Sequence, residues 1–277
     1  MRLFRSVLDF YINSSIHVAL AVCAMSCITM IQFDLNIDKD VLFFTFFATI
    51  TGYNFVKFFG IAKFHHRRLT SRLRSIQLFS LLAFILMTVF FFRLQTITMV
   101  LITAFGLVTF LYAIPILPKH LFIDHQRNLR SISGLKIYII ALVWTGVTVL
   151  LPLIDNHVEL SEDIWYASLQ RFLIVIVLML PFEIRDLNFD SLKLSTVPQN
   201  IGIRGTKILG ILFLIVVFSL EYCISDYRQL SIWVHAIFVM LLAIFLLLSY
   251  QRQSRYYSSF WVESLPLWWL GLLLMFS

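Results

Sequence analysis

Charged side chains are concentrated in one short segment that directly follows a long apolar run. They are Glu183, Arg185, Asp186, Asp190 and Lys193. Asp190 lies four positions after Asp186, so on a helix both carboxylates would share one face, about 5–6 Å apart at Cβ. Two carboxylates that close repel each other unless a cation or a proton lies between them. The segment indicates either a cation site at the rim of a membrane span or a solvated helix end in which Arg185 and Lys193 balance the acids.

The composition defines the environment of this segment. Hydrophobic residues make up 60% of the 277 residues and charged residues only 13%, whereas globular domains carry about 25% charged residues. Such a chain has too little polar surface to face water on all sides, which predicts an integral membrane protein. The chain has three cysteines, and no two of them form a CxxC motif. We therefore expect neither a disulfide framework nor a zinc site.

Nine apolar stretches are long enough to span a bilayer, which takes about 20 residues. The first resembles a signal peptide but is longer than a signal core and lacks a small-x-small cleavage site, so we expect it to be retained. A tight turn at Arg93 joins the third and fourth stretches into a hairpin. We predict an all-α membrane protein with one nine-helix domain over residues 1–277. The predicted spans are 13–33, 41–61, 76–93, 96–115, 134–152, 164–182, 206–223, 230–250 and 259–276.

The distribution of charge between the spans predicts the orientation. If the N-terminus is cytoplasmic, the inside segments hold most of the 22 lysines and arginines, while the outside loops are acidic, as the positive-inside rule requires. This pattern predicts a cytoplasmic N-terminus and an outside C-terminus, and we expect a bacterial inner (plasma) membrane. It also explains the net charge of +7 without nucleic acid as a partner.

Three cationic loops, after the second, fourth and sixth spans, would share one membrane face with Asp186 and Asp190. Many cations beside a pair of carboxylates suit a phosphorylated ligand that arrives with a divalent metal. Alternatively, the cations only set the topology and bind no ligand.

Three segments of the chain resemble the UbiA superfamily of intramembrane prenyltransferases. The segment 184–190, with Lys193 after it, is similar to the second aspartate-rich motif of that family. Residues 111–115, together with Arg130 and Lys136, resemble the end of the family's fourth helix and the start of its fifth. Residues 70–74 resemble the segment that follows the family's first motif.

The resemblance implies nine helices around a cavity that faces the cytoplasm and opens to lipid on one side. Two aspartate-rich motifs would hold magnesium ions and the diphosphate of a prenyl donor there. The family's first motif reads Asn-Asp-x-x-Asp, and this chain departs from it. When Asn54 is aligned with the Asn of that motif, Phe55, Phe58 and Ala62 stand where the family has aspartates. A metal would then have protein ligands from the second motif only, or Lys57 would lie against a phosphate in place of a metal.

The leading hypothesis is a membrane prenyltransferase that transfers a prenyl group from a prenyl diphosphate to a lipophilic or aromatic acceptor. Asp186 and Asp190 would be the catalytic pair and would bind Mg²⁺. The alternative is an inactive protein of the same fold that binds lipid or isoprenoid, or serves as a partner subunit. A transporter is disfavoured because the charges lie at the ends of the spans. The expected contacts to the diphosphate are Asn54, Lys57, Tyr112, Arg130, Lys136 and Lys193.

Overall fold

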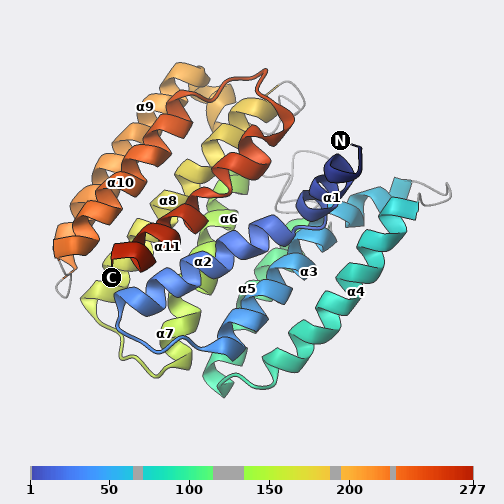
Figure 1. Cartoon of the computed structure of the whole chain (residues 1–277), viewed down its shortest axis with the longest axis horizontal. Coiled ribbons are helices and arrows are strands. Elements are labelled where there is room, and N and C mark those ends of the chain that lie inside the picture. Colours follow the sequence, from blue (N-terminus) through green and yellow to red (C-terminus); the bar gives the residue numbers. More distant parts are fainter. Residues whose placement is uncertain (1, 65–70, 115–133, 188–194, 225–228, 277) are drawn as a thin grey trace, which may run out of the picture.

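The computed structural model describes residues 2–64, 71–114, 134–187, 195–224 and 229–276, which form helices and no strand (Figure 1). Three of the helical segments have π or 3₁₀ geometry and are labelled η. In chain order the segments are α1 (Arg2–Asn13), α2 (Ile16–Gln32), α3 (Lys39–Phe64), α4 (Ser71–Phe91), α5 (Thr96–Ala113), α6 (Leu135–Thr145), η3 (Gly146–Leu150), α7 (Leu151–Asp155), α8 (Glu162–Asp186), α9 (Val197–Leu220), η5 (Glu221–Cys223), α10 (Gln229–Leu247), η6 (Tyr257–Val262) and α11 (Leu265–Phe276).

Every predicted span coincides with a helix or with consecutive helical segments. Within the described residues, seven helices are long and apolar enough to cross a membrane, and α1 with α2 makes an eighth if this bent pair is one span. The remaining predicted span, 230–250, corresponds to α10, whose apolar part, Ile232–Leu247, is shorter. The all-α membrane fold is therefore confirmed, while the count of nine spans stays a prediction.

The first span differs from the prediction of one straight helix over 13–33. A break at Ser14 and Ser15 bends α1 away from α2 by 55°, and Ser15 has a left-handed backbone with φ of 65°. Both serines are fully buried. The bend is fixed by His17, which bonds Tyr11 Oη on α1 at 2.9 Å and the Phe260 carbonyl of η6 at 2.9 Å.

Helix α8 is the centre of the packing. Its residues 173–178 and 180 are buried, and α6, α9 and α10 lie against it. In Figure 1, α4 forms one edge of the molecule, α9 and α10 form the other, and α2 packs on α11 between them. Two-thirds of the α8 span, 67%, is buried, against 11% for α4 and for α5. Apolar side chains at this exposed edge would face lipid, and α8 carries Asp186 to the end of the bundle.

The expectation that charges lie only at the ends of spans was wrong for Arg171. Its side chain lies inside α8 and is 2% exposed. The guanidinium donates to the Met25 carbonyl at 2.7 Å and to Thr29 Oγ1 at 3.2 Å, both on α2, and stacks 5.3 Å from the Trp269 ring centroid. Arg171 thus ties α8 to α2 and α11 in the core.

A second buried polar cluster joins α8 to η5 and α10. Gln170 Nε2 donates to Glu221 Oε2 at 2.7 Å and to the Val217 carbonyl at 3.1 Å. His235 Nδ1 lies 3.4 Å from the same Glu221 oxygen. Glu221 lies 19 positions after the kink at Gly202 near the start of α9, so about 28 Å of helix separates it from the end of the bundle where Asp186 lies.

Candidate functional site

The end of α8 holds two ion pairs. Arg185 donates to both carboxylate oxygens of Asp186, from Nε at 2.8 Å and from Nη2 at 3.2 Å. Three positions earlier, Glu183 is buried, and its Oε1 lies 3.2 Å from Lys136 Nζ on α6. Lys136, a predicted diphosphate contact, is therefore held beside the end of α8 by an acid that directly precedes the segment 184–190.

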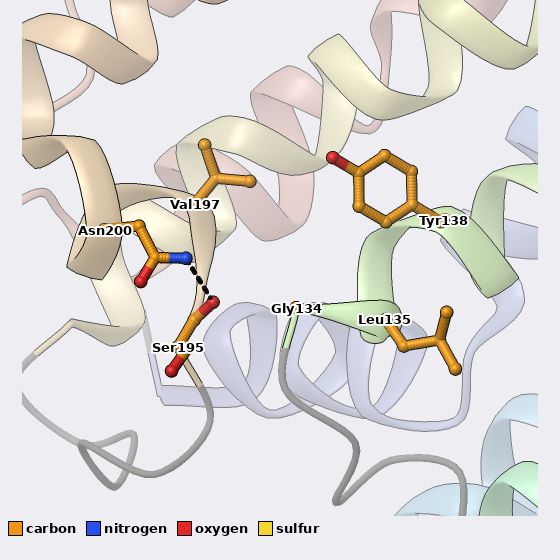
Figure 2. A pocket seen from close by; sticks show the side chains of 6 residues that line it. All are labelled: Gly134, Leu135, Tyr138, Ser195, Val197 and Asn200. Atoms are coloured by element: carbon orange, nitrogen blue, oxygen red, sulfur yellow. Dashed lines mark hydrogen bonds between the residues drawn. The ribbon is translucent and has the colours of Figure 1, made fainter.

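A small pocket lies beside these pairs, where the start of α6 faces the start of α9 (Figure 2). Gly134 has a left-handed φ of 70°, and a Cβ there would come 3.4 Å from the Ser195 carbonyl. Asn200 Nδ2 donates to that same carbonyl at 3.0 Å, as Figure 2 shows. The segments that lead into α6 and α9 are thus side by side. The cavity measures about 270 Å³ and is lined by Gly134, Leu135, Tyr138, Ser195, Val197 and Asn200.

On α3, Asn54 is the hub of a buried hydrogen-bond network. Its Oδ1 accepts from Ser15 Oγ at 2.8 Å, and its Nδ2 donates to the Ser14 carbonyl at 3.0 Å and to Ser80 Oγ at 2.8 Å. Asn54 is 2% exposed. It therefore joins α3 to the break before α2 and to α4, and its predicted contact with a diphosphate stays a prediction.

Lys57 extends this network toward the interior. Its Nζ donates to Ser15 Oγ at 2.8 Å. The Ser15 hydroxyl in turn donates to Asn54 Oδ1, so Lys57 is linked to Asn54 through Ser15. Nζ also lies 6.0 Å from the centroid of the Tyr53 ring, one turn earlier. The Tyr53 hydroxyl accepts from Trp144 Nε1 at 3.0 Å and interacts electrostatically with Tyr112 of α5.

The site contains one acid that the sequence analysis missed. Glu263, between η6 and α11, interacts electrostatically with Lys57 and with Arg185. Tyr53 and Glu263 are half-buried, and Lys57 is exposed. The signal in the sequence was that Glu263 is the one charged residue of the predicted span 259–276, since an ionisable residue inside a span is a functional candidate.

Glu263 relates the two predicted halves of the site only through electrostatics. It interacts with Lys57 of α3 and with Arg185 of α8, and Arg185 is paired with Asp186. Tyr112, buried at the end of α5, lies in the same region through its neighbour Tyr53. The predicted site residues Arg130, Asp190 and Lys193 lie outside the described residues.

Comparison with known proteins identifies the fold. No family model and no curated protein matches the sequence. Two solved structures match. The apo structure of a UbiA homologue from Aeropyrum pernix K1 superposes with a TM-score of 0.66 at 11% identity, over 94% of this chain and 98% of that one. The chain has the UbiA fold. The second structure, from a study of "the biosynthesis of Digeranylgeranylglyceryl phosphate synthase in membranes", gives a TM-score of 0.57 at 16% identity, over 99% and 97% of the two chains.

Within this UbiA fold, the first motif offers no carboxylate. Phe55 stacks on Phe110 of α5, with ring centroids 6.3 Å apart and planes at 9°, and Phe58 is half-buried. The side chain of Ala62 lies outside the described part. Among the described residues, no group of three or more His, Cys, Asp or Glu side chains is placed to hold a metal. Both carboxylate oxygens of Asp186 accept from Arg185, and magnesium binding by Asp186 and Asp190 stays a prediction because Asp190 lies outside the described residues.

Proposed function

We propose that the chain is a membrane prenyltransferase of UbiA type that binds a prenyl diphosphate between the ends of α3 and α8. The observation that carries this proposal is the UbiA fold, which covers 94% of the chain. Within that fold, Glu263 interacts electrostatically both with Lys57 and with Arg185, the partner of Asp186. Cations at Lys57 and Arg185 suit the oxygens of a diphosphate, and carboxylates at the α8 end suit its accompanying metal.

The chain's own residues would prepare the leaving group. Lys57, fixed through Ser15 and Asn54, would donate to a diphosphate oxygen and offset the charge that grows there when the C1–O bond breaks. Tyr112, near Tyr53, would donate a hydrogen bond on the same side. Magnesium bound by Asp186 and Asp190 would supply further charge stabilisation. We expect Arg130, Lys136 and Lys193 to bind the remaining oxygens.

The prenyl chain would lie toward the apolar edge of the bundle. Phe55 and Phe110 form a stacked pair on the α3–α5 side, and α5 is largely exposed to the surroundings of the protein. Aromatic ring faces also favour a nearby cation, which suits the allyl cation left after the bond breaks. A lipophilic or aromatic acceptor would reach this cation from the membrane.

A second function is a binder or partner subunit without turnover. The observation that favours it is the stack of Phe55 on Phe110 at a place where the family's first motif carries an acid. Such a protein would hold an isoprenoid lipid and need no metal.

A thermal-shift titration with farnesyl and geranylgeranyl diphosphate, with and without magnesium, tests the proposal. A ligand at 100 times its Kd stabilises the native state by about 2.7 kcal/mol. We expect a magnesium-dependent rise in the melting temperature that is lost in Asp186→Asn. The matched control is Asp163→Asn, the same change in the first turn of α8, which should keep the rise.

The outcomes separate the two functions. A rise that needs magnesium, followed by release of pyrophosphate in the presence of a membrane-lipid extract, supports the enzyme. A rise without magnesium, and without pyrophosphate release, supports the binder. If neither prenyl diphosphate shifts the melting temperature, the likeness to UbiA proteins is one of fold alone and the proposed function is wrong.

A further inference from the structure

Three cations lie where α9 begins and α10 ends, at the edge of the molecule opposite α4 (Figure 1). Lys207 Nζ of α9 donates to the carbonyl of Leu247, the last residue of α10, at 2.7 Å. Arg204 precedes Lys207 by three positions, so the two side chains lie on neighbouring sides of one helical turn. Arg252 follows Leu247 by five positions. The three cations are therefore together at one end of this helix pair.

The charges of this basic patch (Arg204, Lys207 and Arg252) are not offset within the helix pair, because neither α9 nor α10 contains an acidic residue. The side chains of Arg204 and Arg252 are exposed. Within the part of the chain that the structure describes, they form no hydrogen bond or ion pair. Arg255, the next cation along the chain, differs, because its Nη2 lies 3.4 Å from Asp9 Oδ1 of α1. Two arginines at this end are thus available for an external anion.

An apolar surface continues from the basic patch along both helices. Ile208 comes four positions after Arg204, on the same side of α9, and is 62% exposed. Leu248 directly follows α10 and is 61% exposed, and Ile244, one turn earlier, is exposed as well. Tyr250 is also exposed, and tyrosine is typical of the membrane–water interface. Cations at the rim of an apolar surface match an anionic phospholipid, whose charged headgroup lies directly above its acyl chains.

We propose that the basic patch binds the headgroup of an anionic phospholipid, whose acyl chains lie along Ile208 and Leu248. Arg204 and Arg252 bind the phosphate oxygens, because a guanidinium can donate two parallel hydrogen bonds to a phosphate. Lys207, whose ammonium already bonds the end of α10, adds its charge. The bound lipid holds the start of α9 against the end of α10. This site does not depend on the proposed function, because it lies on the outer edge of the bundle and needs no prenyl diphosphate.

A thermal-shift titration of the protein in a nonionic detergent with dioctanoyl phosphatidylglycerol, an anionic phospholipid, tests the inference. We expect a saturable rise in the melting temperature, and no such rise with dioctanoyl phosphatidylcholine, which is zwitterionic. Glycerol 3-phosphate, which carries a phosphate without acyl chains, should also give no rise. The double variant Arg204→Gln with Arg252→Gln should bind phosphatidylglycerol at least tenfold more weakly, because each cation near an anionic headgroup strengthens binding severalfold. Without lipid, its melting temperature should equal that of the wild type, since both side chains are exposed.

Arg74→Gln is the matched control. It removes an exposed arginine in the first turn of α4, at the opposite edge of the molecule, and should leave the affinity for phosphatidylglycerol at its wild-type value. Charges that only set the topology would be interchangeable, so equal weakening by Arg74→Gln and by the double variant would overturn the inference. An unchanged affinity in the double variant, no rise with phosphatidylglycerol, or an equal rise with phosphatidylcholine would also overturn it. A rise with glycerol 3-phosphate would make the patch a site for free anions and would overturn the lipid assignment.

Discussion

Replacing Asn54 by leucine measures how much the hub on α3 contributes to the fold and to the site. The substitution keeps a side chain of similar size and removes three hydrogen bonds, to Ser15, to the Ser14 carbonyl and to Ser80. A hydrogen bond between membrane helices contributes about 0.6 kcal/mol on average and at most about 1.7, and one in a soluble protein contributes about 1. The loss of three such bonds should lower the free energy of unfolding by about 2–3 kcal/mol.

The assay is a denaturant titration in detergent, followed by the fluorescence of the six tryptophans. Ser80→Ala is the matched control, because it removes one of the three bonds of Asn54 and should cost about 1 kcal/mol. Since Ser15 connects Asn54 to Lys57, Asn54→Leu should also weaken diphosphate binding more than Ser80→Ala does. A variant of Asn54 that is no less stable than Ser80→Ala would refute the hub.

Three further changes test the packing of the helices. Lys136→Met removes the ion pair of Glu183, whose side chain is 3% exposed. It should lower the free energy of unfolding by about 3 kcal/mol or more, and the double variant with Glu183→Gln should recover most of that loss. Equal losses in the single and double variants would contradict this. Gly146→Ala places a methyl group against the ring of Phe105 and should cost about 1–3 kcal/mol, and Phe105→Leu in the same chain should relieve the loss. Gln170→Leu removes the hydrogen bond from Gln170 to the buried side chain of Glu221 in η5. It should lower the melting temperature in detergent, because a buried polar group that loses its donor is costly. An unchanged melting temperature would show that the cluster of Gln170, Glu221 and His235 does not stabilise the fold.

The helices were predictable from the sequence because an apolar run of about 20 residues in a membrane protein has one common solution, a spanning helix. Local pattern could not reveal the bend before α2, because Ser14 and Ser15 carry no strong helix-breaking signal. The bend depends on partners such as Phe260, more than 200 positions away.

The candidate site was predicted in part. Lys57, Tyr112 and Asp186 were singled out through family resemblance and charge, and their roles stay predictions. Glu263 was missed because one acid in an apolar span has no spacing pattern around it, and its meaning comes from Lys57 and Arg185 on other helices. The sequence also could not reveal that Lys136 pairs with Glu183, since 47 positions separate them along the chain.

The central claim is that a prenyl diphosphate binds between α3 and α8. A structure of the protein with an unreactive geranylgeranyl thiodiphosphate and manganese tests it most directly, because manganese can be located by its anomalous scattering. We predict the diphosphate between Lys57 and Arg185, with manganese bound to Asp186 and no second metal beside Asn54. A diphosphate bound elsewhere, or manganese away from Asp186, would contradict the account.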